Sequence, residues 1–576
     1  MPSPLLAVLD AETDPFSFGL TPKPFVWGLQ ILETQEYLEF WDDNLHIRHE
    51  TCTDKLIEYL DKLDTPLRIY AHNGGKFDYF FLLKYLNPQL SLINGRVAEC
   101  SIGDHILRDS WLILPIPLSQ MDKGEIDYNK MKLGERHRHT KEISAYLYKD
   151  CDYLGKWVGG FIRRFGMKIT LASTAFSELK TTDYKIGKTF EDYDNIFRKF
   201  YFGGRVQCFS VGEHLDGPYS YVDINSAYPR AMLDEHPSGP DWLKVFKPPS
   251  DYDGYFAEIV AISKGALPYR DPEDATKKLY FPEDDKPRIY RVTGWEIKAG
   301  LETNTLEILE YKSIYITKAK QNFKDYILKF YQEKLEADKN GDEESRLFSK
   351  LLMNSAYGKF GMDGRKFKDY LLMPEGEAPP LLMEGEELAQ HQWHHYCDME
   401  TGETMFEKDN PKKDFYDVAT AASITGWVRA FLWRAICSSK GVIYCDTDSI
   451  MCKKFSGVIG SELGEWSIEA RLDQAYIAQR KMYAVRISGL EWLTKIEKWI
   501  KKGSDKDKKP ERWKYACKGI PKKQLKAKDI VEGIKTGTNL LIEKEAPSFS
   551  LKHGSRFMAR EIAFNSIEKS LQNSPD

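Results

Sequence analysis

Residues 441–455 constrain this chain more than any other segment, because they place two carboxylates at the tip of an apolar hairpin. Their sequence, GVIYCDTDSIMCKKF, predicts a strand, a tight turn at Asp446-Thr447-Asp448 and a second strand. Two acids at the end of a buried strand are costly unless they meet a cation. Mg²⁺ favours a few carboxylates together with substrate phosphates. The hairpin therefore predicts a metal site; the alternative is an ordinary turn, in which aspartate is common.

A second acid follows another apolar run. The segment 218–229, PYSYVDINSAYP, predicts a strand that carries Asp223 at its end and breaks at Asn225-Ser226. A carboxylate on a neighbouring strand would face the hairpin acids, as two metal ions about 3.5–4 Å apart require. Taken alone, Asp223 is better explained as a cap or turn residue.

A predicted helix at 343–360 carries a polar face suited to a triphosphate. Its residues are spaced by four, four and three positions, so they lie on one side of the helix. They are Arg346, Lys350, Asn354 and Tyr357. Two cations, an amide and a phenol suit phosphates followed by a sugar and a base. Lys334 and Lys339, on the preceding helix and at its end, would add weaker cations. The alternative is a solvated face, which usually mixes both signs of charge.

The charge balance is uneven along the chain. With 82 Lys and Arg against 87 Asp and Glu, the net charge is −5, which on its own is a modest argument against a nucleic-acid-binding protein. Residues 480–530, however, hold 17 basic and 6 acidic residues, a local charge of +11. Tryptophan and tyrosine are interleaved there. This distribution indicates a basic track for a nucleic-acid backbone, set apart from the acidic clusters.

Several classes of protein are excluded by the composition. The length of 576 residues predicts roughly three or four domains. No run of 18 apolar residues exists, so we expect no transmembrane helix. The N-terminal MPSPLLAVLDAET lacks the basic region of a secretory signal. Nine scattered cysteines favour a reducing cytoplasm over a disulfide framework.

Four segments, in the expected order, resemble the polymerase motifs of family B DNA polymerases. They are DINSAYP at 223–229 for motif A, KLLMNSAYG at 350–358 for motif B, YCDTDS at 444–449 for motif C and KMY at 481–483 for the KxY motif. The resemblance implies that Asp223 and Asp448 hold two Mg²⁺ (or Mn²⁺) ions, with Asp446 assisting through water.

The same resemblance implies roles around the substrate. Tyr228 would stack under the sugar and exclude a 2′-hydroxyl, while Lys481 and Tyr483 would hold the primer terminus. The nucleotide-binding set would be Tyr228, Lys339, Arg346, Lys350, Asn354 and Tyr357.

The N-terminal part resembles a 3′–5′ exonuclease of the same family. Its three motifs are Asp10-Ala-Glu12, the stretch Asn73 to Asp78, and Tyr146 to Asp150. The resemblance implies that the carboxylates of Asp10, Glu12, Asp78 and Asp150 hold a second pair of metal ions, and that Tyr146 orients the attacking water. The register Tyr148 to Asp152 also fits the third motif; the lysine before Asp150 favours the first register.

Finer details resemble the protein-primed polymerases of small tailed phages, the φ29-like group. The segments are LPIPL at 114–118, KGEIDY at 123–128 and YFGG at 201–204. Lys123 would steady the scissile phosphate. The residues that the resemblance places on DNA are Thr13, Asn73, Phe77, Ser110 and Trp111 in the exonuclease, and Tyr201, Gly203 and Gly204 in the link between the two halves.

The resemblance implies an α/β and α+β multidomain chain: an RNase H-like exonuclease plus a right-hand polymerase with two terminal-protein-region insertions. The 127 positions between motifs A and B exceed what a finger helix needs, which indicates the first insertion. The expected units are the exonuclease (1–172), palm with motif A (173–234), first insertion (235–325), fingers (326–361), second insertion (362–413), palm with motif C and KxY (414–515) and thumb (516–576).

We expect processive, strand-displacing replication of a linear phage genome in the cytoplasm of the bacterial host. The partners would be primer-template DNA, dNTPs, a terminal protein primer and a single-stranded DNA-binding protein, with no membrane and a monomeric chain. The alternative within the family is a conventionally primed polymerase. Outside it, the alternatives are a nuclease with a DNA-binding half and a non-catalytic scaffold, against which the intact carboxylates argue.

Two departures from the group deserve mention. Ala227 in motif A and Ala356 in motif B stand where the group usually has leucine, which would tune packing near the nucleotide. The sequence HQWHHYC at 391–397 invites a zinc site, but no second pair of ligands follows at a suitable spacing, so a solvated loop is favoured.

Overall fold

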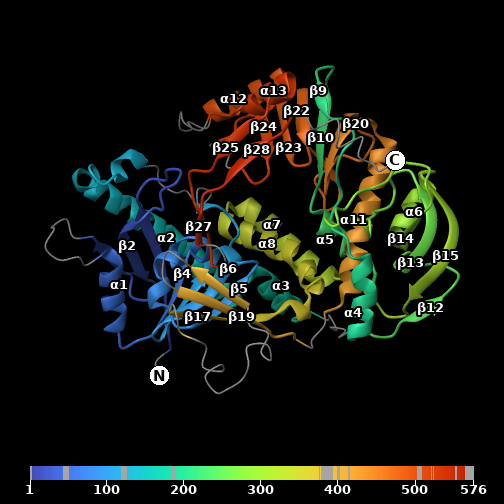
Figure 1. The fold of residues 1–576 in the computed structure, drawn as a ribbon. Helices are drawn as coiled ribbons and strands as arrows, with labels where there is room; N and C mark the ends of the chain where they lie inside the picture. The colour runs from blue at the N-terminus through green and yellow to red at the C-terminus, as the bar shows by residue number, and fades with distance from the viewer. Residues whose placement is uncertain are drawn as a thin grey trace.

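Two large β-sheets organise the chain (Figure 1). The computed structural model describes residues 3–42, 51–118, 126–182, 189–374, 377, 394–398, 403–412, 416–501, 509–520, 522, 524–551 and 554–564. One sheet lies in the blue N-terminal part, and the other combines green and orange segments that are far apart in sequence. Among the described residues, no helix is both long and apolar enough to cross a membrane.

The N-terminal sheet has ten strands in the order β18-β19-β17-β5-β6-β7-β4-β1-β2-β3. Strands β1, β4 and β7 are parallel, and the other pairs are antiparallel. Leu6 and Val8 join the hydrophobic cluster of helix α2, whereas Ala7 and Leu9 join that of α1, because successive side chains of a strand point to opposite faces. The elements named here are β1 Leu5–Thr13, β2 Pro24–Ile31, β3 Glu36–Trp41, α1 Cys52–Asp61, β4 Leu67–Ala71, β5 Gln89–Ile93, β6 Arg96–Ile102, β7 His105–Asp109, α2 Thr140–Phe165, β17 Lys368–Pro374, β18 His394–Asp398 and β19 Glu403–Asp409.

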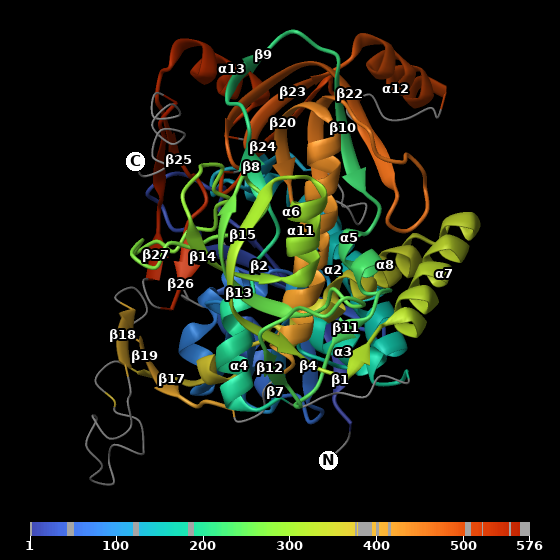
Figure 2. The same ribbon diagram turned by 90° about the vertical axis from the view of Figure 1, so that its right-hand side faces the viewer.

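The second sheet is antiparallel, in the order β24-β23-β22-β10-β21-β20-β8, with β9 paired to β22. Helix α11 (Val418–Ser438) runs beside it through the middle of the molecule (Figures 1 and 2). Of its 21 residues, 17 are buried, which explains why its sequence is apolar on every side. The strands are β8 Val206–Cys208, β9 Gly212–His214, β10 Tyr219–Ile224, β20 Lys440–Asp446, β21 Ser449–Lys454, β22 Trp466–Gln479, β23 Met482–Ile487 and β24 Trp513–Cys517.

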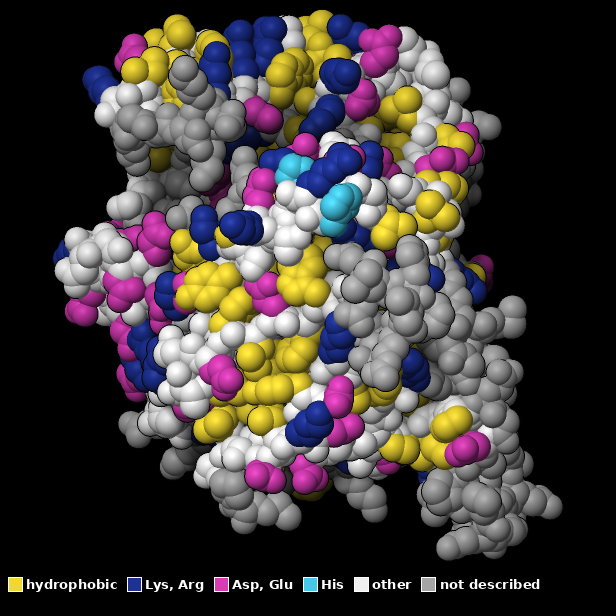
Figure 3. All heavy atoms as spheres, turned by 90° about the vertical axis from the view of Figure 1, so that its left-hand side faces the viewer, with side chains coloured by type: hydrophobic (Ala, Val, Ile, Leu, Met, Phe, Trp, Pro, Cys, Tyr) yellow, Lys and Arg dark blue, Asp and Glu magenta, His cyan; other side chains and the backbone are white. Residues whose placement is uncertain are grey.

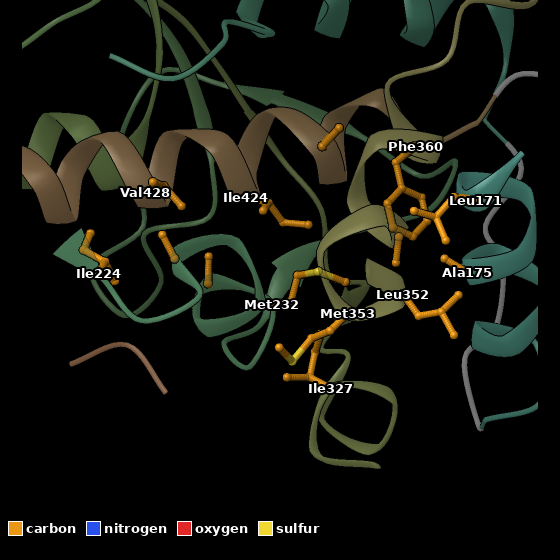
Figure 4. Packing of buried hydrophobic residues seen from close by; sticks show 14 of the residues in the cluster. Leu171, Ala175, Ile224, Met232, Ile327, Leu352, Met353, Phe360, Ile424 and Val428 are labelled. Carbon is orange, nitrogen blue, oxygen red and sulfur yellow. The ribbon is translucent and has the colours of Figure 1, made fainter. Parts of the chain in front are cut away.

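One hydrophobic core joins helices from both halves of the chain (Figure 4). Two helices, α7 (Lys324–Asn340) and α8 (Glu343–Phe360), meet at Gly341, whose φ of 69° is a conformation that favours glycine. Phe348 of α8 packs against Phe161 of α2, with ring centroids 5.2 Å apart. The core residues labelled in Figure 4 come from α3 (Leu171–Leu179), β10, the residue that follows α5 (Ala227–Ala231), α7, α8 and α11.

A separate four-stranded sheet is formed by residues that lie, in sequence, between the segments 223–229 and 350–358. Its order is β12-β15-β13-β14, and helix α6 packs against it. A buried ion pair of 2.7 Å joins Arg429 of α11 to Glu296 of α6. The elements are β12 Leu243–Val245, β13 Phe256–Ser263, β14 Arg288–Thr293, α6 Gly294–Glu302 and β15 Leu306–Ile316.

The segment 362–413, expected as the second insertion, carries the strands β17, β18 and β19. Strand β17 pairs with β5, with Tyr370 opposite Leu90, and thereby extends the N-terminal sheet. The amide of Leu372 also donates to the Pro88 carbonyl at 2.7 Å, and the side chains of Leu372 and Met405 enter the core of that sheet. The sequence could not show this join, because strand addition depends on a free sheet edge far away in sequence. The side chains of the cluster 391–397 lie outside the described residues.

The C-terminal segment forms helices and short hairpins at the top of the molecule and reaches back to the first sheet (Figure 1). Phe549 stacks on Phe80, with ring centroids 5.2 Å apart, and also contacts Phe77 and Phe81. Lys and Arg side chains gather along the top of the face shown in Figure 3. Figure 1 shows three elements in this part of the molecule. They are α12 Gly489–Lys501, β24 and α13 Ala527–Thr536. The hairpin strands are β25 Leu540–Glu543, β26 Ser548–Ser550, β27 Gly554–Arg556 and β28 Ala559–Ile562.

Candidate active sites

The carboxylates of the second sheet meet at the ends of neighbouring strands. Asp223, on β10, lies opposite Ser449, the first residue of β21, so it is beside the turn that carries Asp448. The amide of Ile224 donates to the Asp448 carbonyl at 2.8 Å and closes this end of the sheet. The structure thus brings together two acids that are 225 positions apart, as the two strand-end motifs predicted.

The surroundings of Asp223 and Asp448 raise the pKa values of both carboxyl groups. Burial raises the pKa of Asp223 to about 7, and the charges of Asp448 and Glu469 add to that rise, while Lys350 and Lys514 oppose it. Burial, followed by the charge of Asp446, raises the pKa of Asp448 to about 6. Both shifts show that the ionised pair favours a cation, and carboxylate oxygens are the ligands that Mg²⁺ prefers.

The turn between β20 and β21 is held by the YFGG segment. Thr447 has a φ of 60°, and its amide donates to the Arg205 carbonyl at 2.6 Å. A Cβ on Gly204 would lie 2.7 Å from Cγ2 of Thr447, so a larger residue would push on this turn. Arg429 donates to the carbonyls of Phe202 and Gly203 at 2.6 and 2.9 Å. Gly204 therefore packs closely against the acidic turn, and Gly203 accepts from Arg429 through its carbonyl.

Asp446 is bound by a lysine of the KMY segment. Nζ of Lys481 lies 2.6 and 2.8 Å from the two carboxylate oxygens of Asp446, and the Tyr444 hydroxyl donates to one of them at 3.2 Å. Tyr483, the other predicted primer residue, is within 3.3 Å of the Tyr221 hydroxyl. Lys481 is thus linked directly to the acidic turn, and Tyr483 contacts the neighbouring strand β10.

A cavity of about 540 Å³ opens beside this site, between β22 and the C-terminal segment. It is lined by Tyr221, Tyr483, Glu469, Glu511, Trp513, Lys514, Tyr515, Lys522 and Lys526. Nζ of Lys514 lies 3.3 Å from a carboxylate oxygen of Glu469. Neither Glu469 nor Lys514 belongs to a sequence motif, so neither was predicted as a site residue. The only sequence signal was the dense lysine of residues 480–530.

The cations of α7 and α8 form one cluster. Burial lowers the pKa of Lys334, the nearby Asp338 opposes this, and the charges of Arg346 and Lys350 add to the lowering. Nε of Arg346 lies 2.5 Å from a carboxylate oxygen of Asp338. Lys339, chosen from the sequence, instead lies exposed in the last turn of α7. The third cation of the cluster is Lys334, one helical turn earlier.

Tyrosines form the wall next to these cations. The rings of Tyr228 and Tyr357 stack, with centroids 4.3 Å apart and planes 11° apart. Tyr201 lies near both, and its charge contributes to the raised pKa of each phenol, after burial. Asn354 donates from its amide to the Lys350 carbonyl of its own helix at 2.8 Å. Except for Lys339, the predicted nucleotide-binding residues therefore share one region.

The carboxylates of the first sheet form a tighter group. Oxygens of Asp10 and Glu12 on β1 and of Asp150 on α2 all lie within 4.8 Å of one another, which is a spacing suited to a metal ion. Asp78 is buried at the start of the short turn Asp78–Phe81 and lies outside this group of three. Tyr146, one turn before Asp150, is within 3.4 Å of the Tyr128 hydroxyl, and burial followed by the Asp150 charge raises its pKa.

The geometry separates the two registers of the third exonuclease motif. Tyr146 and Asp150 are buried and face β1, as the preferred register requires. Tyr148 is 44% exposed, and Asp152 pairs with Lys156 at 2.5 Å on the helix surface. The alternative register therefore lies away from the carboxylate group.

The residues predicted to bind single-stranded DNA differ in solvent exposure. Ser110 is fully buried, and its hydroxyl donates to the Ala71 carbonyl at 3.2 Å, so its side chain does not reach the surface. Asn73 has a φ of 65° and accepts from Arg96 at 2.9 Å. Trp111 and Phe77 are half-buried, and Thr13 is 9% exposed. Lys123 lies outside the described residues.

Comparisons with known proteins agree with this geometry. The model for "DNA polymerase type B, organellar and viral" matches residues 118–453. The chain is 34% identical to the DNA-directed DNA polymerase of Enterobacteria phage PRD1 over 97% of each chain. The chain belongs to the organellar and viral type B DNA polymerases.

Further relatives and solved structures support the same family and fold. A probable DNA polymerase of Agaricus bitorquis is 25% identical; the match covers 72% of this chain and 64% of that protein. A crystal structure of Phi29 DNA polymerase covers 98% of this chain and 100% of its own at a TM-score of 0.70 and 18% identity. Its complex with primer-template DNA and incoming nucleotides has the same TM-score. The predicted family and the multidomain exonuclease-plus-polymerase fold are confirmed.

The carboxylate group on the first sheet can be tested by metal binding. In an Asp448→Asn background, adding Asp150→Asn should weaken Mn²⁺ binding about tenfold or more, because one of three converging ligands is lost. Adding Asp152→Asn is the matched control and should leave the affinity unchanged. Free Mn²⁺ measured by electron paramagnetic resonance reports both; equal losses in the two variants would contradict the assignment.

Proposed function

We propose that this polymerase pairs DNA synthesis with 3′–5′ proofreading at two separate two-metal sites. One observation carries the proposal. Each large sheet holds its own group of buried or partly buried carboxylates, on β10 and the β20–β21 turn in one case and on β1 and α2 in the other. The residues proposed as ligands are Asp223, Asp448 and Asp446 for synthesis, and Asp10, Glu12, Asp78 and Asp150 for hydrolysis.

The donor set fits divalent ions such as Mg²⁺, since all ligands are carboxylates and two of them have raised pKa values. When bound, such ions stabilise the charge that develops on the attacking and leaving oxygens of a phosphoryl transfer. Lys481 holds Asp446 in place through its ion pair and so orients the acidic turn. Tyr483 and the lysines that line the adjacent cavity hold the primer backbone.

For the nucleotide, the cluster of Lys334, Arg346 and Lys350 neutralises the triphosphate. Arg346 exchanges its carboxylate partner Asp338 for a phosphate when the nucleotide binds. The stacked Tyr228 and Tyr357 form the floor under the sugar and base, and the Tyr228 ring excludes a 2′-hydroxyl. In the exonuclease, the Tyr146 hydroxyl orients the attacking water beside Asp150.

Protein priming and strand displacement are part of the same proposal. The four-stranded sheet β12–β15 offers a surface for a terminal protein, and the segment β17–β19, fixed to the exonuclease sheet, separates the duplex ahead of synthesis. The proposed domains of the protein have the limits that the sequence predicts. A single-stranded DNA-binding protein would cover the displaced strand, and the host cytoplasm would be the place of action.

Separate active sites predict separable losses. Asp448→Asn should abolish nucleotide incorporation and leave degradation of single-stranded DNA intact. Asp10→Ala combined with Glu12→Ala should do the reverse. Primer-extension and single-strand degradation assays measure the two activities, and loss of both in either variant would contradict separate sites.

The ion pair of Arg346 predicts an effect on nucleotide affinity. Asp338→Asn releases Arg346 for the triphosphate, and an exposed pair of this kind is worth about 0.5–1 kcal/mol. The KM for dNTPs should therefore fall about two- to fivefold with kcat unchanged. Glu336→Gln, on the same helix, is the control; an unchanged or higher KM in Asp338→Asn would count against the exchange.

Strand displacement can be tested on a primed single-stranded circle without helicase or clamp. The protein should make products longer than the circle. Leu372→Ala, which loosens β17 from β5, should still complete one circle but extend fewer products beyond it. Covalent attachment of a labelled nucleotide to a co-encoded protein tests priming separately, and a conventionally primed enzyme would give no such product.

A further inference from the structure

A buried ladder of side chains fastens the segment after motif A to α11. Asp417, Thr420 and Ser423 are spaced by three, so they lie along one side of the helix. The amide of Gly239 donates to Asp417 at 2.8 Å, and the Thr420 hydroxyl donates to the Pro237 carbonyl at 2.9 Å. The third rung joins Ser423 to Nδ1 of His236 at 2.9 Å. All three α11 side chains in this ladder are buried.

The third rung belongs to a relay whose direction is fixed by chemistry. Nε2 of His236 lies 2.8 Å from the Ala231 carbonyl, which only accepts, so Nε2 carries the proton. Nδ1 of His236 is then an acceptor, and the Ser423 hydroxyl donates to it. Oγ of Ser423 in turn accepts from Nε1 of Trp295 at 2.9 Å, since an indole only donates. Three hydrogen bonds therefore run from Trp295 to the Ala231 carbonyl.

The surroundings keep this relay in one state. His236 is fully buried, and burial lowers its pKa to about 4, while the charge of Asp234 opposes that shift. The imidazole is therefore neutral near pH 7, as a residue that donates at one nitrogen and accepts at the other must be. A buried polar network in which each bond is made specifies one arrangement of the elements that it joins.

The relay ends at the Ala231 carbonyl, on the same short helix as one of the two stacked tyrosines. Ala231 is the last residue of α5, a five-residue helix whose C-terminal carbonyls have no partner within the helix. The same helix carries Tyr228, which stacks on Tyr357 of α8. A bond to the Ala231 carbonyl therefore limits how α5 can rotate, and with it the position of the Tyr228 ring.

We propose that His236 is a positioning residue for nucleotide selection, which acts by holding the Ala231 carbonyl and thereby Tyr228. The inference deepens, and rests on, the proposed role of Tyr228 under the sugar. The same relay begins at Trp295 of α6, the helix that packs against the four-stranded sheet, and passes through Ser423. This sheet and its helix therefore also support the stacked Tyr228 and Tyr357. No motif of the sequence analysis includes His236, Ser423 or Trp295.

Two substitutions of His236 separate its two bonds. His236→Gln places an amide near the position of Nε2 and keeps a donor for the Ala231 carbonyl. His236→Asn reaches only the position of Nδ1 and loses that donor. We expect the dNTP KM of the glutamine variant to stay within about twofold of the parent. In the asparagine variant KM should rise about tenfold, with a smaller change in kcat, and ribonucleotide discrimination should fall about tenfold.

Stability and exonuclease activity serve as controls in the full-length protein. Both variants lose a buried imidazole, so both should melt at a similar temperature and degrade single-stranded DNA at the parental rate. A merely structural role would make the kinetic defect follow the melting temperature. Equal KM values in the two variants, or a joint loss of synthesis and degradation in the asparagine variant, would overturn the proposal.

Two further variants complete the test. Trp295→Phe keeps the ring but removes the donor to Ser423, and should shift KM in the same direction as His236→Asn by a smaller factor; an unchanged KM would disprove the extension of the relay to α6. Tyr228→Val tests the proposed function itself. If it leaves ribonucleotide discrimination unchanged, the role of Tyr228 fails, and a glutamine–asparagine difference in KM would then contradict the route through Tyr228.

Discussion

The free energy needed to hold ionised carboxylates close together and partly away from water is the main physical limit on this structure. Asp223 and Asp448 sit at strand ends where burial and the charges of neighbouring carboxylates raise their pKa values to about 7 and 6. Lys350 and Lys514 offset part of that cost at Asp223, and Lys481 does so at Asp448. These cations come from α8, β24 and the β22–β23 turn, three elements that are distant in sequence. The fold can therefore be understood as an arrangement that brings opposite charges to one end of a sheet.

Two helices carry this arrangement between the halves of the chain. Helix α2 presents Asp150 to β1 near its middle and Phe161 to α8 further on, so the carboxylate group of the first sheet and helix α8 share one support. Helix α11 fixes the YFGG segment through Arg429, whose partner Glu296 lies in the four-stranded unit. A buried pair of this kind specifies position, because removing one partner leaves an uncompensated charge.

Much of the candidate site was predictable from local patterns. The acidic hairpin and the polar helix face came from spacing, and the four polymerase motifs from order; each needs only a few neighbouring residues. The residues that were missed share a different property. Glu469, Lys514 and His236 belong to no local motif, and they matter because a distant segment lies beside them. Lys339 and Ser110 show the reverse, since their place in the sequence did not reveal that one is exposed and the other buried.

The sequence by itself determined the type of chemistry, because carboxylates at strand ends and cations on a helix face are set by spacing within a few residues. It also determined the family, through the order of its motifs. Only the tertiary structure decided which carboxylates meet, that β17 extends the N-terminal sheet, and that Trp295, Ser423 and His236 form a relay. Those facts depend on contacts between segments far apart in sequence. Burial and hydrogen-bond direction exist only once the chain has folded.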